Sequence, residues 1–312
     1  MIVELGRAVL QLCEVVPDGV VVFFGSYAYL DAVCKVWQKT GSADGGNSLW
    51  EQMVRRKKIF VEPSSNATSS STTKPTHTTS IDSTSAPKPP TTTDSILQAY
   101  TAHILSPTRT DNGALLLAVI GGSLSEGINF SDRLGRCVIV VGLPFPNASG
   151  SEWKARLDHI GAKAVEGARG ASAAAEQGGK AGMADSAIEG GAAGGGGAGG
   201  RPKVVALSAK EEKDISELAK REFYTNTCMR SVNQSVGRAI RHQNDWACIL
   251  LIDGRWEKRK ELREKLPGWI RRSLVGVEDA GGIRGGVAGS AEKWMRTRGR
   301  LVEFFEGKKG RA

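Results

Sequence analysis

Four uninterrupted apolar runs limit the folds that this chain can adopt. They span residues 20–24, 114–120, 136–143, where the charged Arg136 precedes the apolar residues, and 246–252, and Val, Ile, Leu and Phe dominate them. Such runs are typical of strands that are covered on both faces, as in a parallel sheet. The segments between them are long enough to cross over a sheet, and several have helical periodicity. We therefore predict an α/β fold with a mainly parallel sheet flanked by helices.

Two stretches have compositions that are unsuited to a packed core. Residues 63–93 consist mostly of Ser, Thr, Pro and Lys, and residues 167–203 consist mostly of Gly and Ala. Because such segments bury too little apolar surface to offset their ordering entropy, we expect both to be disordered insertions. The remaining sequence up to residue 275, about 200 residues, has the size of one domain. We interpret residues 276–312 as a basic, Gly-rich tail with room for one helix at 291–305.

Charge and cysteine content narrow the class of protein. The chain has 42 Lys and Arg residues against 33 Asp and Glu residues, and its net charge of +9 favours an anionic partner such as nucleic acid. Its five cysteines are scattered and contain no CxxC pair, which indicates a reducing compartment and excludes a complete metal or iron–sulfur site made by this chain. No stretch approaches the ~18 apolar residues of a membrane span. We expect a soluble intracellular protein.

One polar stretch, NQSVGRAIRH at 233–242, predicts an anion-binding surface. If it is helical, Gln234, Arg238 and Arg241 share one face. Arginine suits an anion with several oxygens because its planar fork donates paired hydrogen bonds and stays charged. Gly237 in a helix interior costs about 1 kcal/mol relative to Ala, which indicates a close backbone approach. The alternative is that these arginines form an ordinary solvated helix face.

Two further loops lie where parallel sheets commonly bind ligands. GSY at 25–27 follows the first apolar run, and GGSLSEGINF at 121–130 follows the second. The second loop is rich in Gly and Ser and contains one carboxylate, Glu126, so its backbone N–H groups could cradle phosphates. An ordinary tight turn explains the same composition equally well. A GxxxxGK[ST] phosphate-binding loop occurs nowhere in the sequence.

Together these stretches resemble a known family. FFGSY, GGSLSEGINFSDRLGRCVIVVGLPFPN and NQSVGRAIRHQNDWACILLIDGRW are similar to motifs IV, V and VI of the XPD-like iron–sulfur DNA helicases. The similarity is greatest to the branch linked to sister-chromatid cohesion and chromosome transmission. It covers residues 1–62, 94–160 and 204–275. The resemblance implies a RecA-like C-terminal motor domain of an ATP-dependent helicase that translocates on single-stranded DNA and unwinds duplexes.

The resemblance also implies roles for individual residues. In motif VI, Gln234, Arg238 and Arg241 would reach the γ-phosphate of ATP, with Arg241 as the arginine finger. In motif V, the residues expected to bind ATP are Glu126, Gly127 and Asn129. The residues expected to contact DNA are Phe24, Ser26, Tyr27, Ser123 and Ser125.

The resemblance places several components outside this chain. ATP and Mg²⁺ would be shared with an N-terminal motor domain that carries the phosphate-binding loop and the DEAH motif, and an iron–sulfur cluster is expected only in that missing half. The chain alone would then be inactive. The implied partners are single-stranded or forked DNA and replication or cohesion factors, and the implied location is the nucleus. Two alternatives are a non-catalytic nucleic-acid-binding fragment and an unrelated nucleotide-binding α/β protein.

Overall fold

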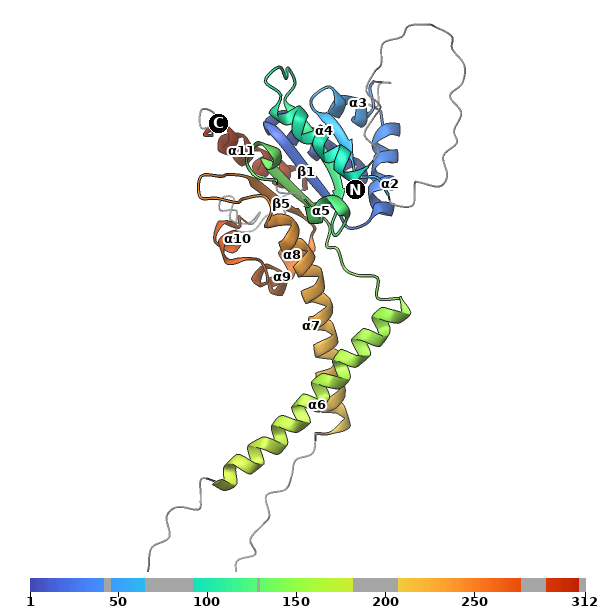
Figure 1. Ribbon diagram of the computed structural model, residues 1–312, viewed down its shortest axis with the longest axis vertical. Helices are drawn as coiled ribbons and strands as arrows, with labels where there is room; N and C mark the ends of the chain where they lie inside the picture. Colours follow the sequence, from blue (N-terminus) through green and yellow to red (C-terminus); the bar gives the residue numbers. More distant parts are fainter. Residues whose placement is uncertain (42–45, 65–91, 128–129, 182–206, 276–289, 309–312) are drawn as a thin grey trace, which may run out of the picture. The chain divides into compact units, whose positions relative to one another are not determined.

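A computed structural model describes residues 1–41, 46–64, 92–127, 130–181, 207–275 and 290–308 (Figure 1). The described part of the chain contains one sheet of five strands in the order β2-β3-β1-β4-β5, and every neighbouring pair is parallel. The strands are β1 (Asp18–Phe24), β2 (Lys58–Val61), β3 (Gly113–Val119), β4 (Cys137–Val141) and β5 (Cys248–Ile252). This topology confirms the predicted parallel α/β fold.

Burial along the strands follows their place in the sheet. All residues of β1, β3 and β4 are buried, because strands and helices surround them. By contrast, β5 is an edge strand whose five residues are all only partly buried. The expectation of a fully buried strand at 246–252 was therefore too strong, although the strand itself is present.

Four helices cover one face of the sheet. Alternate residues of the central strand, Val20, Val22 and Phe24, belong to an apolar cluster that includes Trp37 and Phe305 from these helices. Side chains two apart in a strand lie on the same face, so this cluster defines that face. The helices are α1 (Ile2–Val15), α2 (Tyr27–Lys39), α3 (Leu49–Val54) and α11 (Ser290–Glu306).

The opposite face carries α4 (Thr93–Leu105), α5 (Ser123–Gly127) and the 3₁₀ helix η2 (Asp132–Gly135), and Figure 1 shows α4 and α5 in front of the strands. Phe23 of β1 meets Phe130 edge to face at a centroid distance of 5.8 Å. On β2, Phe60 packs in the same way against Tyr100 of α4, at 5.6 Å. The Tyr100 hydroxyl then donates to the carbonyl of Leu134 at 2.6 Å, which fixes η2 over this face.

A buried lysine closes the amino ends of the strands. The Nζ atom of Lys57 donates to three carbonyls, those of Val16 (2.8 Å), Asp18 (2.9 Å) and Asn112 (2.7 Å). Burial lowers the pKa of Lys57 to about 8 because it disfavours the charged ammonium. The three carbonyls lie on separate segments, so one side chain joins the end of α1, the start of β1 and the start of β3.

Short helices follow β5. They are α8 (Arg255–Lys258), α9 (Lys260–Glu264) and α10 (Gly268–Ser273). Their apolar side chains, including Leu262 and Ile270, are buried together with Leu266. The amide of Asn233 donates to the carbonyl of Lys265 at 2.8 Å and ties this region to the preceding long helix. The packed element predicted around residues 266–270 is therefore present.

The chain divides into two compact units rather than the single domain that we predicted. The first comprises Met1–Pro144 and Cys228–Ala312, and the second comprises Phe145–Thr227. Within the second unit, α6 (Ser151–Ala181) lies beside the first part of α7 (Ala209–Val236), joined by a 2.9 Å ion pair between Lys220 and Asp158. The helices approach closely at Gly161, where a Cβ atom would lie 2.2 Å from the hydroxyl of Ser216.

The boundaries of both predicted insertions need revision. Helix α6 runs to Ala181, so residues 167–181 are helical rather than disordered. The abundant alanines of this stretch have the highest helix propensity and outweigh its glycines. Helix α4 begins at Thr93, inside the other predicted insertion. The rest of both stretches, 65–91 and 182–203, lies outside the described residues.

The predicted tail also contains part of the core. The expected helix exists as α11, but it is not an appendage: Leu301 and Phe305 are 6% and 2% exposed and belong to the main apolar cluster. The indole of Trp294 donates to the side chain of Gln11 on α1. A domain boundary at residue 275 is therefore wrong, since this helix completes one face of the first unit.

No described helix combines the length and apolarity needed to span a bilayer.

Candidate functional site

A buried carboxylate joins the loops that follow β1 and β3. Glu62 is 3% exposed, and its Oε1 atom accepts hydrogen bonds from the Tyr27 hydroxyl and the Leu124 N–H group, both at 3.0 Å. Its Oε2 atom accepts from the N–H of Val119 at 2.8 Å. The three donors belong to α2, α5 and β3. Glu62 therefore sets the relative position of the two loops in which we predicted DNA contacts.

The surroundings of Glu62 leave no room for a side chain at position 122, and its charge affects the titration of Tyr27. A Cβ atom on Gly122 would lie 2.6 Å from Oε1 of Glu62 and 2.7 Å from the Tyr27 hydroxyl, so only glycine fits there without a shift. Burial, followed by the negative charge of Glu62, raises the pKa of Tyr27 to about 12. Tyr27 therefore stays protonated and remains a donor at neutral pH.

Two of the five expected DNA contacts are internal. Phe24 is fully buried and packs edge to face against Tyr29 and Trp37, because it is the last residue of the central strand. Ser125 is 5% exposed and its hydroxyl donates to the carbonyl of Gly122 at 2.9 Å. Neither side chain offers an exposed contact to DNA, and both assignments are corrected.

The other three expected DNA contacts are accessible to different degrees. Ser26 is exposed and caps α2 by accepting from the Tyr29 N–H group at 3.2 Å. Ser123 is also exposed, at the start of α5, whereas Tyr27 is half-buried. Of the residues expected at the nucleotide, Glu126 and Gly127 lie in α5, where only their backbone is described, and Asn129 lies outside the described residues.

The helix predicted for residues 233–242 ends early. Helix α7 stops at Val236, and Gly237 and Ala239 close a tight turn through hydrogen bonds to the carbonyls of Asn233 (2.9 Å) and Val236 (3.2 Å). Beyond the turn, the backbone bonds to other segments instead of continuing the helix. We call residues 237–245 the arginine turn. The expectation that Gln234, Arg238 and Arg241 share one helix face is therefore wrong.

Gln234 and Arg238 nevertheless meet the loop after β3. They lie at a hollow of about 240 Å³ that is lined by Gly121, Ser125, Ser231, Gln234, Ser235 and Arg238. Gln234 is exposed and Arg238 is half-buried. Arg241 is exposed on the arginine turn and is not among the lining residues. Two of the three predicted phosphate contacts thus converge with the predicted phosphate-cradling loop.

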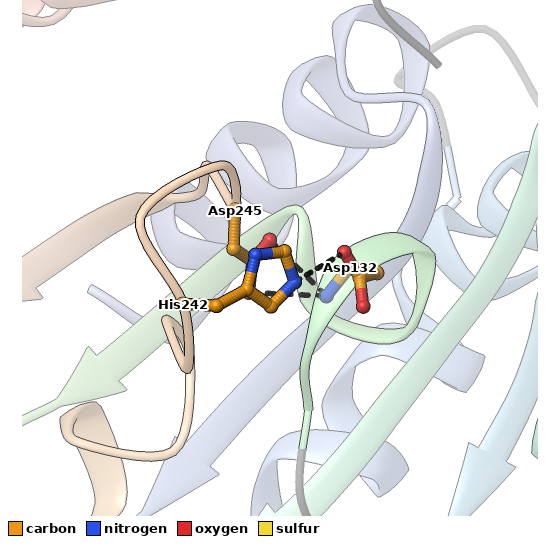
Figure 2. Close-up of side chains that lie close together, drawn as sticks. All are labelled: Asp132, His242 and Asp245. Atoms are coloured by element: carbon orange, nitrogen blue, oxygen red, sulfur yellow. Dashed lines mark hydrogen bonds and ion pairs between the residues drawn. The ribbon is translucent and has the colours of Figure 1, made fainter.

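A second carboxylate, Asp245, organises the end of the arginine turn. Figure 2 shows Asp245 beside Asp132 and His242, three residues whose ligand atoms lie within 4.8 Å of one another. Such a group could hold a metal ion, but Asp245 already accepts from the N–H groups of Asp132 and Trp246 and from Arg136 at 3.2 Å. The adjacent guanidinium also repels a cation. The contacts therefore favour a hydrogen-bonded clamp over a metal centre.

Neither organising carboxylate, Glu62 or Asp245, has a clear signal in the sequence. Glu62 follows a short apolar strand and Asp245 precedes another, where charged residues are usually solvated. Nothing in their local spacing reveals that both are buried. Only the proximity of each carboxylate to a predicted loop could have raised the question.

Comparisons with known proteins agree with this architecture. A family model described as "Helicase C-terminal domain" matches residues 9–273. The chain is 39% identical over 275 residues to "ATP-dependent DNA helicase chl1" of Aspergillus clavatus, which covers 88% of this chain and 29% of that protein. It is 38% identical over 312 residues to the protein of the same name from Neurospora crassa, covering 99% of this chain and 27% of that protein.

Among solved structures, Xpd4 of S. tokodaii matches with 13% identity and a TM-score of 0.39, over 86% of this chain and 33% of that chain. The chain thus spans less than a third of the length of these two curated relatives. The family model covers most of the chain, and these two curated relatives align with 88% and 99% of it. The chain therefore belongs to the family of helicase C-terminal domains, as found in CHL1-type ATP-dependent DNA helicases.

Proposed function

We propose that this chain is the second motor domain of an ATP-dependent DNA helicase and contributes arginines to ATP hydrolysis. The hollow where Gln234 and Arg238 meet the loop after β3 carries this proposal, because it joins a guanidinium and a carboxamide to small, Gly- and Ser-rich surroundings. Such donors suit phosphate oxygens. The names of the relatives, ATP-dependent DNA helicases, support the same reading.

The residues of this chain fit one half of an ATP site. Gln234 and Arg238 would bind phosphate oxygens of ATP. The exposed Arg241 on the arginine turn would reach the γ-phosphate from this chain's side of the site. When bound, ATP with Mg²⁺ would supply the phosphoryl group and neutralise part of its charge. The task of these side chains is to stabilise charge that develops in the transition state. The metal ligands and the phosphate-binding loop would come from the N-terminal motor domain.

An iron–sulfur cluster does not fit this chain. The five cysteines are free, and among the described residues no three of them lie close enough to share a metal. Cys13, Cys137 and Cys228 are buried in separate elements. Any cluster in the complete enzyme would therefore be held by other residues.

The DNA side of the proposal rests on the loops held by Glu62. Ser26 and Ser123 are exposed at the carboxyl ends of β1 and β3, and the chain carries a net charge of +9. Backbone and hydroxyl donors of this kind bind phosphates without reading sequence. Because α5 leads from these loops towards the arginine turn, we propose that ATP hydrolysis and movement along single-stranded DNA are coupled through this segment. The same charge also favours the second candidate, a non-catalytic nucleic-acid-binding module.

A chimaera tests the proposal. This chain replaces the matching segment of the Aspergillus clavatus relative, and ATPase activity is measured with and without single-stranded DNA. We expect DNA-stimulated hydrolysis, and we expect Arg241→Ala to lower kcat by about 10³-fold or more with little change in the KM for ATP. Arg241→Lys should rescue poorly, because a point charge does not reproduce the guanidinium fork.

Arg7→Ala is the matched control, since Arg7 is an exposed arginine on α1 that pairs with Glu4 of the same helix. It should leave kcat unchanged. If Arg241→Ala hydrolysed ATP at the unmutated rate, the arginine turn would be a solvated surface and the proposed role would fail. A chimaera that binds DNA without hydrolysing ATP would instead favour the non-catalytic module.

A further inference from the structure

Asp245 is a buried carboxylate that accepts hydrogen bonds from two segments distant in the sequence, residues 130–136 and residues 241–246. Its side chain is fully buried, and both of its oxygens accept from the N–H of Asp132 at 3.2 Å. Oδ1 also accepts from the N–H of Trp246 at 2.8 Å and from Nη1 of Arg136 at 3.2 Å. Oδ2 accepts from the N–H of Arg241 at 3.4 Å. One carboxylate thus contacts both the arginine turn and residues 130–136.

Further contacts join the same two segments. The N–H of Phe130 donates to the carbonyl of Arg238 at 3.1 Å. Nε2 of His242 lies 3.1 Å from Oδ1 of Asp132, and Figure 2 shows His242 and Asp132 facing each other beside Asp245. The N–H of Asp245 itself donates to the carbonyl of His242 at 3.0 Å and closes the turn. The arginine turn is therefore attached at its beginning, at Arg238, and at its end.

Arg136 is the reason why residue 245 must be a carboxylate. Its guanidinium lies over the Trp246 ring at 3.9 Å and donates to the carbonyl of Trp246 at 3.0 Å. Because Arg136 is only 5% exposed, its charge needs a nearby anion, and Asp245 supplies it. An amide at position 245 would keep the shape but would offer one acceptor oxygen and direct an NH₂ group at backbone donors.

We infer that Asp245 is a positioning residue that fixes the arginine turn, and with it Arg241, onto the segment following α5. The inference rests on the proposed function. It states what the hydrogen-bonded group of Asp245, Asp132 and His242 does in that function. Asp245 holds Arg241 through the backbone, because its Oδ2 atom accepts from the N–H of Arg241. The segment that it grips, residues 130–136, continues from the loop held by Glu62. Asp245 thus links the loops proposed to touch DNA with the arginine proposed to act on ATP.

The first test uses this chain alone. Asp245→Asn is compared with Asp18→Asn, a matched control because Asp18 is also buried and also forms ion pairs with arginine, here Arg109 and Arg133 at the amino end of β1. Amide hydrogen exchange is measured by mass spectrometry. We expect Asp245→Asn to speed exchange in residues 237–245 by about tenfold or more, and Asp18→Asn to leave those residues unchanged.

The second test uses the chimaera. Asp245→Asn should lower kcat by about 10- to 100-fold while the KM for ATP and the affinity for single-stranded DNA stay within about twofold, because a misplaced catalytic group loses turnover rather than binding. Asp18→Asn should lower the melting temperature without lowering kcat at temperatures well below it. A merely structural role for Asp245 would give the same pattern as Asp18→Asn and would overturn the inference.

Two outcomes separate this inference from the proposed function. If Arg241→Ala lowers kcat and Asp245→Asn, still folded, does not, the positioning role is wrong and the arginine role stands. If Arg241→Ala itself has no effect, both fail. Should Asp245→Asn not fold, His242→Ala decides, because His242 is exposed and its ring joins the turn to Asp132. Faster exchange in residues 237–245 with a severalfold lower kcat then supports the clamp, and an unchanged kcat overturns it.

Discussion

Glu62 shows how one buried side chain can set the geometry of a site that it does not enter. Its three hydrogen-bond donors come from three elements, so no neighbouring residue can replace it. A side chain at position 122 would collide with Oε1, so the loop after β3 must approach Glu62 through a glycine. The two loops at the carboxyl ends of β1 and β3 therefore keep a fixed spacing.

Replacing Glu62 by glutamine tests this role. Glu62→Gln keeps one acceptor oxygen and turns the other into an NH₂ donor that faces an N–H or O–H group. We expect the free energy of unfolding to fall by about 1–3 kcal/mol, as for a buried hydrogen-bonding group left without its partner. The measurement is urea denaturation, with the exposed Glu4→Gln as a control that should stay within about 0.5 kcal/mol.

The same variant should change the titration of Tyr27. Burial and then the charge of Glu62 raise the pKa of Tyr27 to about 12, so Glu62→Gln should lower it towards the ordinary value of 10.0 without reaching it. Absorbance titration of the tyrosines in both proteins measures the difference. An unchanged Tyr27 titration would show that the two side chains do not interact as described.

At the level of single residues, the sequence predicted which side chains come together better than which of them are exposed. It identified Gln234 and Arg238, which do converge with the loop after β3. It also assigned surface contacts to Phe24 and Ser125, which are buried. Local sequence does not reveal whether a strand-end residue points inward, because that depends on which helices cover each face of the sheet.

Among the elements, helix α7 shows where periodicity misleads. The spacing of Gln234, Arg238 and Arg241 fits a helix face, but Gly237 is unfavourable in a helix and the next backbone groups find other partners. The carbonyl of Arg238 accepts from Phe130, and the N–H of Arg241 donates to Asp245. Phe130 lies more than 100 positions from Arg238 in the sequence, whereas Asp245 lies only 4 positions from Arg241. Neither contact appears as a pattern in the sequence. Tertiary hydrogen bonds thus end the helix.

Helix α11 was predicted as a helix but not as part of the core. Phe305→Ala should lower the free energy of unfolding by about 3–5 kcal/mol, the cost of removing a buried aromatic ring. Met295→Ala on the same helix is the control, since Met295 is 59% exposed and should change stability by less than about 0.5 kcal/mol. Denaturant unfolding followed by tryptophan fluorescence would measure both. Equal stability of the two variants would mean that α11 does not pack as described.

For the whole molecule, the architecture followed from the sequence only in part. The apolar runs predicted parallel strands, whereas the division into two units depends on α6 and α7 packing against each other through Gly161, Lys220 and Asp158. A Gly- and Ala-dominated composition hides that packing, because it resembles a linker. The basic, Gly-rich sequence before α11 resembles a tail, so it did not indicate that this helix packs in the core.

The stability of the fold at low pH should depend on the ion pairs of Asp18 with Arg109 and Arg133. Burial raises the pKa of Asp18, but hydrogen bonds from Arg133 and Arg109 outweigh it, and the net pKa lies below the ordinary value of 3.8. A carboxyl with a lowered folded-state pKa stabilises the fold fully above its unfolded-state pKa, and this stabilisation is lost as the pH falls through the folded-state pKa.

Asp18→Asn should therefore cost about 1–3 kcal/mol of unfolding free energy at pH 7. The difference from the unmutated protein should shrink as the pH is lowered below about 4. Asparagine suits the site otherwise, because residue 18 has a positive φ of 57° that Asn tolerates. Urea unfolding at a series of pH values gives the comparison, and a difference that grows on acidification would contradict the assigned pairs.

The packing of α11 on α1 has a consequence for how the molecule folds. The hydrogen bond between Trp294 and Gln11 joins residues 283 positions apart. Closing so large a loop before the sheet exists would cost much chain entropy, whereas pairing of β1, β3 and β4 brings the two helices together in stages. During synthesis on the ribosome, the part of α1 that α11 covers therefore stays open to water and to chaperones until α11 has emerged and can dock.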